Sequence, residues 1–150
     1  MRGLWTTPEQ LRQLTEQLVS WESQGLTQGE VDFPEKLHAK LMETEYFQKH
    51  PELVSLGEVN WERRYVTALY KHEQASRTVV LLSHFDTVAV HEYGDLAPLA
   101  YQPAKLEKAF QKIKNEFKPE MQADLASGDY LFGRGIMDMK SGLAIHMSLI

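Results

Sequence analysis

Apolar side chains recur at helical spacing near the start of the chain. Thr7, Pro8 and Gln10 are typical of a helix start, with Thr7 as the cap, Pro8 in the first turn and Gln10 completing a capping box. The apolar residues that follow, three or four positions apart, are Leu11, Leu14, Leu18 and Trp21. They predict an amphipathic helix that stops by Gly25, and residues 24–30 have the composition of a loop.

A second helix and two short strands are predicted next. The sequence Asp-Phe-Pro-Glu at 32–35 has cap-like spacing, and the apolar stripe that follows is Phe33, Leu37 and Leu41. The stripe fades before Pro51. Residues 53–59 and 64–70 then have the apolar and β-branched character of short strands.

The run Val-Val-Leu-Leu at 79–82 is continuous and apolar, which is typical of a strand buried on both faces. Polar residues at 71–77 separate this run from the preceding strand at 64–70. We therefore expect the two strands to pair as an antiparallel hairpin. The run then changes abruptly to Ser-His-Phe-Asp-Thr at 83–87.

The second half of the chain continues the alternation of helices and strands. Residues 104–117 have a clean amphipathic pattern that Pro119 ends. A short apolar strand near 130–132, a glycine-rich turn and an apolar run at 143–150 follow. The alternation favours an α/β layered fold. Because the last run contains no helix stop signal, we expect the N-terminal fragment of a longer chain.

Composition narrows the class of protein and its partners. The 150 residues carry a formal net charge of −5, which argues against nucleic acid or an anionic membrane as the main partner. The absence of cysteine excludes disulfides and thiolate zinc sites. The first five residues lack the apolar core of a signal peptide, and no apolar run approaches the roughly 20 residues of a membrane span. We therefore expect a cytoplasmic protein.

Candidate metal ligands follow the run at 79–82. Side chains two apart on a strand point to the same side, so His84 and Asp86 can face one site while Phe85 turns to the core. In open α/β sheets ligands bind at the carboxyl ends of strands, where this pair would lie. Asp138 lies in the glycine-rich turn, where its carboxylate can lean toward a metal. Imidazole and carboxylate groups suit zinc and similar divalent ions.

Two motifs in this order resemble those of the M20 family of metallopeptidases and aminoacylases: His-Phe-Asp-Thr-Val at 84–88 and Gly-Arg-Gly-Ile-Met-Asp-Met-Lys-Ser-Gly at 133–142. The long connection at 90–129, which contains a helix, resembles the RocB-type arginine-utilisation branch. The resemblance implies an α/β, zinc-exopeptidase-like (phosphorylase/hydrolase-like) fold with a central mixed sheet, incomplete at the C-terminus. Residues 1–150 would be the N-terminal part of its catalytic domain, without the lid domain.

The resemblance also implies roles for three residues. His84 binds one of two Zn²⁺ ions, for which Co²⁺ or Mn²⁺ are alternatives, and Asp138 bridges both ions. Asp86 is the catalytic residue that braces the site without binding metal. The implied activity is hydrolysis of a small peptide or an N-acyl amino acid, in arginine or amino-acid catabolism. The family's glutamate base is not expected within residues 1–150, so the chain alone is expected to be inactive.

Simpler interpretations stand beside these roles. His84 and Asp86 could be a strand-end histidine hydrogen-bonded to a loop carboxylate, and Asp138 could be a turn or helix-cap residue. A non-catalytic M20-like binding protein is the alternative function. Arg134 and Lys140 receive no role, and the sequence assigns no oligomeric state. The remaining histidines are expected at the core boundary (His146) or on the surface (His38, His50, His72 and His91).

Overall fold

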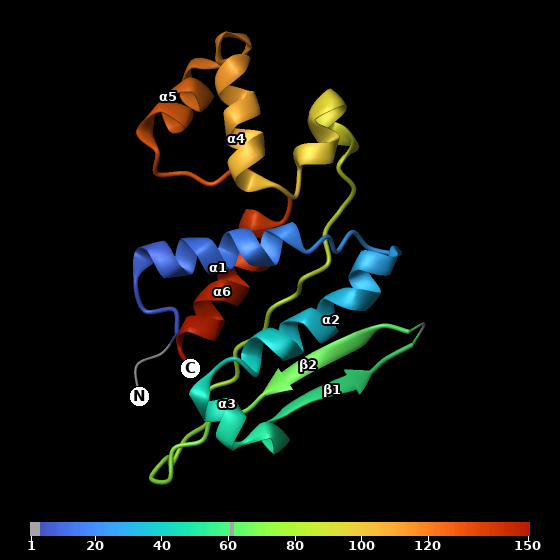
Figure 1. Cartoon of the computed structure of the whole chain (residues 1–150), viewed down its shortest axis with the longest axis vertical. Helices are drawn as coiled ribbons and strands as arrows, with labels where there is room; N and C mark the ends of the chain where they lie inside the picture. The colour runs from blue at the N-terminus through green and yellow to red at the C-terminus, as the bar shows by residue number, and fades with distance from the viewer. Residues whose placement is uncertain (1–3, 61) are drawn as a thin grey trace.

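The computed structural model describes residues 4–60 and 62–150 (Figure 1). Residues 1–3, part of the segment considered as a signal peptide, lie outside the described residues. The labelled elements are α1 (Pro8–Ser20), α2 (Gln28–Leu41), α3 (Glu45–Lys49), β1 (Val54–Glu58), β2 (Arg64–Ala68), α4 (Pro103–Lys112), α5 (Pro119–Ser127) and α6 (Ser141–Ser148). Short 3₁₀ turns lie at Pro51–Leu53, His91–Leu99 and Lys114–Glu116, and a wide helical turn lies at Ile136–Lys140.

The predicted start of α1 is confirmed. Thr7 Oγ1 accepts a hydrogen bond from the backbone N–H of Gln10 at 3.2 Å, and Gln10 Oε1 accepts one from the backbone N–H of Thr7 at 3.1 Å. This capping box satisfies backbone donors that have no partner within the helix. Leu14 and Leu18 of the predicted stripe are buried. The helix ends at Ser20, before the predicted stop at Gly25.

Helix α2 begins about one turn earlier than the sequence predicted. Its cap position is Thr27, so the first residues of the helix lie in the stretch that was expected to be a loop. Glu30 provides the reason, because its Oε2 accepts a hydrogen bond from the Leu26 N–H at 2.6 Å and closes the turn before the helix. Pro34, which suggested a helix start, instead lies buried inside the helix.

The two strands predicted at 53–59 and 64–70 are confirmed as β1 and β2, but they pair with each other. They form an antiparallel ladder in which Leu56 lies opposite Val66. The connection is short, and the Val59 N–H donates to the Arg63 carbonyl at 2.7 Å. A short connection favours pairing between neighbouring strands. The predicted hairpin between residues 64–70 and the 79–82 run is therefore wrong.

Residues 79–82 do not form the predicted buried strand. Among the described residues they have no strand assignment, and their side chains are 81%, 74%, 47% and 82% exposed in chain order. A strand buried on both faces needs hydrogen-bonded neighbours and a packed layer on each side. The described sheet contains β1 and β2 alone, so neither condition is met here.

The predicted helix at 104–117 is divided in the structure. Helix α4 ends at Lys112, and a 3₁₀ turn at Lys114–Glu116 follows it. Pro119, which was expected to end a helix, begins α5, because a proline in the first turn forfeits no helical hydrogen bond. Helix α5 was not predicted, and the strand expected near 130–132 is not formed.

The apolar core lies where α1, α2, α3, β1 and α6 meet. Its buried members are Trp5, Leu14, Leu18, Phe33, Leu37, Leu41, Tyr46, Phe47, Val54, Ala144 and Met147. Helix α6 crosses beside α1, with which it is in contact, so one face of the apolar C-terminal run is covered (Figure 1). Its other face leaves Ile145 and Leu149 exposed.

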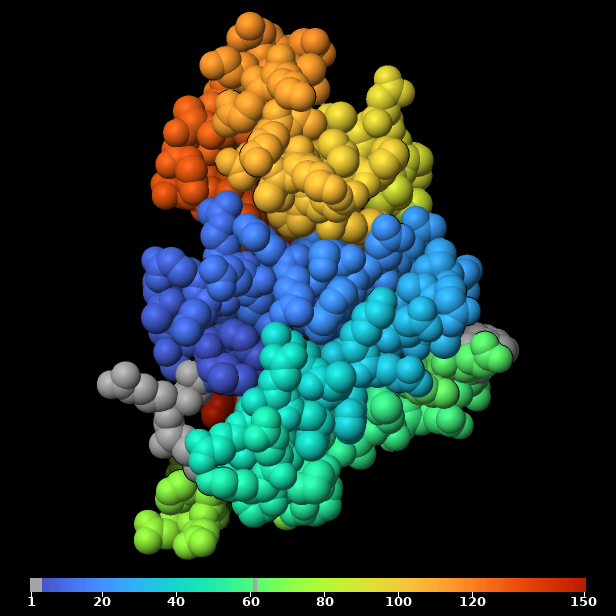
Figure 2. Space-filling model, viewed as in Figure 1, coloured from blue at the N-terminus to red at the C-terminus, as the bar shows by residue number. Residues whose placement is uncertain are grey.

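The α1 and α2 layer separates two parts of the molecule. Figures 1 and 2 show α4 and α5 at one end, the β1–β2 hairpin at the other, and the blue helices between them. In the described part of the chain, no helix is long and apolar enough to cross a membrane. His84 and Asp86 lie on the segment between β2 and α4, and Asp138 lies on the segment between α5 and α6.

Candidate functional site

The three residues predicted to share a site lie together. His84 Nε2 is 2.7 Å from Asp138 Oδ1, although the two residues are 54 positions apart in the chain. On the other side of the ring, His84 Nδ1 lies 3.3 Å from Asp86 Oδ1 and 3.2 Å from the Asp86 carbonyl oxygen. The imidazole is thus held between two carboxylates. All three side chains remain solvent-accessible.

The segment that carries His84 is held by the core and by the loop after α1. Phe85 stacks on Phe33 of α2, with ring centroids 4.6 Å apart, so it turns inward as predicted. Ser23 Oγ donates to the Phe85 carbonyl, and the Thr87 N–H donates to the Ser23 carbonyl at 2.9 Å. His84 and Asp86 therefore face one side and Phe85 the other, as predicted for a strand, although this segment belongs to neither β1 nor β2.

A further contact fixes the start of this segment. Ser83 Oγ lies 2.7 Å from His146 Nδ1 of α6, within hydrogen-bonding distance. His146 is half-buried, in agreement with the core-boundary position expected from the sequence. The pair therefore joins the residue before His84 to the helix that follows Asp138.

A tight glycine turn brings Asp138 to His84. Gly135 has a positive φ of 80°, a conformation that L side chains rarely adopt. A Cβ at Gly135 would lie 2.7 Å from Thr87 Cγ2, so only glycine lets the two segments approach this closely. The turn is closed by the Lys140 N–H, which donates to the Gly135 carbonyl at 2.8 Å. The peptide bond between Asp138 and Met139 is cis.

Lys140, to which the sequence assigned no role, is fully buried beneath this turn. Its Nζ donates to the Trp21 carbonyl at 2.7 Å and lies 4.8 Å from the centroid of the Phe33 ring. Burial lowers the pKa of Lys140 to about 7. The sequence signal was weak, because a lysine at the start of an apolar helix is ordinarily solvated.

Arg134 is the other cation at the site. Its Nη2 donates to Glu92 Oε2 at 2.6 Å, and its guanidinium carbon lies 5.2 Å from the centroid of the Tyr93 ring. The hydrogen bond and positive charge of Arg134 lower the pKa of Glu92. The Nε atom is buried without a hydrogen-bond partner among the described residues. Arg134 thus ties the glycine turn to the segment that follows Val90.

The charges around His84 favour its protonated form. Partial burial acts to lower the pKa of His84, but the hydrogen bond to Asp138 and the charge of Asp86 outweigh it. The pKa is therefore raised above its usual value. An imidazole between two carboxylates is suited to hold a positive charge at Nε2, either a proton or a metal ion.

The donor atoms fit part of a zinc site. His84 Nε2 and Asp138 Oδ1 come from separate segments and face each other, as two ligands of one ion would. They line a pocket of about 270 Å³ that Asp86, Arg134 and Met137 also line. No cluster of three or more His, Cys, Asp or Glu residues that could hold a metal occurs within residues 4–60 and 62–150. The described chain thus offers one imidazole and two carboxylates at this place, fewer groups than a complete zinc site with its supporting residues.

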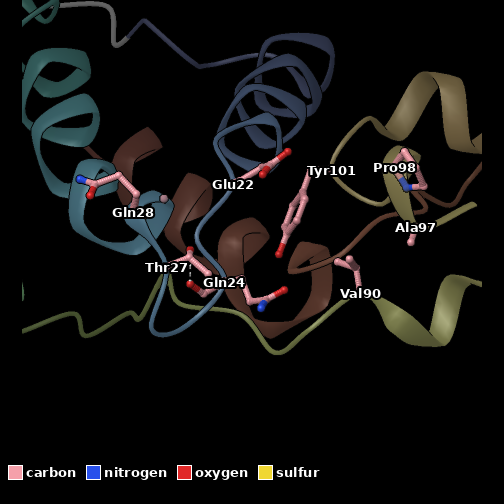
Figure 3. Close-up of a pocket in the computed structure, with 9 residues that line it drawn as sticks. Glu22, Gln24, Thr27, Gln28, Val90, Ala97, Pro98 and Tyr101 are labelled. Carbon is pink, nitrogen blue, oxygen red and sulfur yellow. Dashed lines mark hydrogen bonds between the residues drawn. The ribbon is translucent and has the colours of Figure 1, made fainter.

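A second pocket of about 500 Å³ is lined in part by Tyr101 (Figure 3). Figure 3 shows Glu22 and Gln24 on one side and Val90 and Pro98 on the other. The Tyr101 hydroxyl lies 2.8 Å from Thr87 Oγ1, and Thr87 lines the first pocket. This hydrogen bond joins the walls of the two pockets.

Two proteins of Bacillus subtilis strain 168 are similar to this chain. The uncharacterized protein YqjN is 42% identical over 146 residues, which cover 97% of this chain and 27% of YqjN. Protein RocB is 33% identical over 144 residues, which cover 93% of this chain and 25% of RocB. The chain therefore spans about a quarter of the length of these relatives. No protein-family model and no solved structure matches the chain.

Proposed function

We propose that the chain contributes part of the active site of an M20-type, metal-dependent hydrolase that cleaves the amide bond of a small peptide or an N-acyl amino acid. The observation that carries the proposal is the contact of His84 Nε2 with Asp138 Oδ1 at 2.7 Å, with Asp86 on the opposite ring nitrogen. The similarity to RocB supports a place in arginine or amino-acid catabolism. We place the protein in the cytoplasm.

The proposed roles come from the resemblance to the M20 family, and the orientation of the His84 ring is compatible with them. His84 and Asp138 would hold Zn²⁺, with Asp138 bridging to a second ion, and Co²⁺ or Mn²⁺ could replace them. Asp86 would keep the proton on Nδ1, which leaves the Nε2 lone pair free for the metal. When bound, a pair of such ions polarises an amide carbonyl and activates a water.

The proposal assigns the general base and the remaining metal ligands to residues outside 1–150. A base must lie within hydrogen-bond reach of the attacking water, and two ligands are fewer than a catalytic zinc requires. The proposed fold is the α/β, zinc-exopeptidase-like layered fold, with residues 1–150 as the N-terminal part of the catalytic domain. In that fold the 79–82 run would be a buried strand of the central sheet.

The test uses the complete gene product. His84→Ala and Asp138→Ala should remove bound Zn²⁺ and hydrolysis of N-acyl amino acids, whereas Asp86→Ala should reduce turnover more than metal content. His38→Ala, at a half-buried position of α2, is the control histidine and should change neither quantity. Metal analysis and a turnover assay on the same samples measure both.

The result that would end the bridging assignment is an Asp138→Ala protein with unchanged zinc content and activity. A wild-type protein that binds N-acyl amino acids with no zinc-dependent turnover would favour the non-catalytic, M20-like binding protein instead.

A further inference from the structure

Lys140 carries a buried amino group whose surroundings need an explanation. Its side chain is fully buried, and among the described residues no carboxylate lies within ion-pairing distance of its Nζ. Burying a charged group costs free energy unless polar partners compensate for the lost water. An apolar side chain of similar volume would avoid this cost. The Lys140 Nζ therefore needs a polar partner at a particular place in the fold.

The place is the C-terminal end of α1. Trp21 is the residue that caps this end, and its carbonyl accepts a hydrogen bond from Lys140 Nζ at 2.7 Å. Carbonyls at a helix C-terminus carry the negative end of the helix dipole, which attracts a cation. The rings of Phe33 and Tyr101 lie 4.8 and 5.7 Å from Nζ, and aromatic faces also attract cations.

The same three groups hold the segment that carries His84. The Phe33 ring stacks on Phe85. The Tyr101 hydroxyl lies within hydrogen-bonding distance of Thr87 Oγ1. Trp21 is followed by the loop whose Ser23 bonds to Phe85 and Thr87. Lys140 itself belongs to the wide turn that carries Asp138. Its ammonium therefore lies at the junction between the two halves of the site.

We infer that Lys140 is a positioning residue, which sets the distance between Asp138 and His84 by anchoring the Ile136–Lys140 turn to the Trp21 carbonyl. The Lys140–Trp21 contact is independent of the proposed function, whereas its consequence for metal affinity rests on that function.

A positioning role and a purely structural role predict different results for Lys140→Met. Methionine has a similar volume and no donor for the Trp21 carbonyl. Replacing a buried charge by an apolar side chain of similar size is often neutral or stabilising. A positioning role therefore predicts lower metal affinity without loss of stability. A purely structural role predicts that affinity changes only as far as stability does.

The experiment compares Lys140→Met with Lys36→Met in the complete gene product. Lys36 is an exposed lysine of α2 whose charge also acts on Lys140, so it controls for the loss of a nearby cation. Zn²⁺ affinity is measured by competition with a chromophoric chelator, and the unfolding midpoint is measured on metal-free protein. We expect about 10- to 100-fold weaker Zn²⁺ binding for Lys140→Met, with an unchanged or higher midpoint, and no change for Lys36→Met.

A second measurement needs no substitution at Lys140. In protein labelled with ¹⁵N-lysine, the signal of the Lys140 side chain should shift when Zn²⁺ is added, and the shift should be absent in Asp138→Ala. Unchanged zinc affinity in Lys140→Met would overturn the inference, and so would a Lys140 signal that does not shift when Zn²⁺ is added. If Asp138→Ala retains full zinc affinity, the proposed function itself is wrong. If Asp138→Ala loses zinc and Lys140→Met does not, only the positioning role of Lys140 is wrong.

Discussion

At the scale of single residues, the site depends on how closely two segments approach each other. His84 and Asp138 meet because Gly135 passes within contact distance of Thr87. The positive φ of the Gly135 backbone favours glycine over any L residue. The Thr87 methyl group, which belongs to a distant segment, leaves no room for a Cβ at this position. The sequence predicted the tight turn, whereas the contact with Thr87 required the structure.

Gly135→Ala should destabilise the chain and separate the two site segments. Gly128→Ala is the matched control, because Gly128 also has a positive φ, 74°, but a Cβ there meets nothing within 4 Å. Both variants should lose about 1 kcal/mol to backbone strain, and Gly135→Ala should lose about 1–3 kcal/mol more through overpacking against Thr87. Denaturant unfolding measures the difference.

The double variant tests the cause. Thr87→Ser removes the methyl group and keeps the hydroxyl that contacts Tyr101. It should restore part of the stability lost in Gly135→Ala. If the double variant is as unstable as the sum of the two single variants, the close contact is not the reason for the glycine.

At the scale of elements, the loop after α1 positions the segment that the sequence assigned to a strand. The Ser23 hydroxyl donates a hydrogen bond to the Phe85 carbonyl, and the Ser23 carbonyl accepts one from the Thr87 N–H. Gly25 N–H then donates to the Thr87 carbonyl at 2.9 Å. These bonds replace the sheet ladder that was expected to hold His84 and Asp86. The predicted direction of the side chains was right although the predicted strand was wrong.

Ser23→Ala should therefore be costly. The partly buried Phe85 carbonyl would lose the donor that the fully buried Ser23 supplies, which costs about 1–3 kcal/mol. Ser20→Ala is the matched control, because Ser20 Oγ makes a similar bond to the Gln17 carbonyl on the exposed surface. Its loss should cost less than about 0.5 kcal/mol. Equal unfolding free energies for the two variants would show that the loop after α1 does not hold the site.

At the scale of the whole molecule, the main unexplained surface is the apolar run at 79–82. Val79, Val80 and Leu82 are more than 70% exposed, next to the candidate site. Apolar surface of this kind promotes association. The described residues supply one hairpin, β1–β2, and no layer for this run. In the proposed layered fold the same side chains would be buried.

Leu82→Lys distinguishes these two environments. In the 150-residue chain, where Leu82 is 82% exposed, the change should leave stability unchanged and reduce self-association. In the complete gene product, a lysine in a buried central strand should cost several kcal/mol. Leu26→Lys is the control, because Leu26 is 88% exposed in the loop before α2 and should be tolerated in both. Full tolerance of Leu82→Lys in the complete product would contradict the proposed fold.

The sequence by itself determined features that depend on neighbouring residues. The capping box of α1, the stripe of α2, the two strands of the hairpin and the inward turn of Phe85 all follow from local spacing. The convergence of His84, Asp86 and Asp138 was also predicted, because the resemblance placed both motifs at one site.

Only the tertiary structure decided which distant groups hold that site. Lys140 and Trp21 are 119 positions apart, and Arg134 and Glu92 are 42 apart, so no local pattern pairs them. The sequence predicted that the 79–82 run is buried, and the structure exposes it, because a strand is buried only when other segments supply its neighbours. Local spacing specifies where a side chain points, whereas burial and partners depend on the rest of the chain.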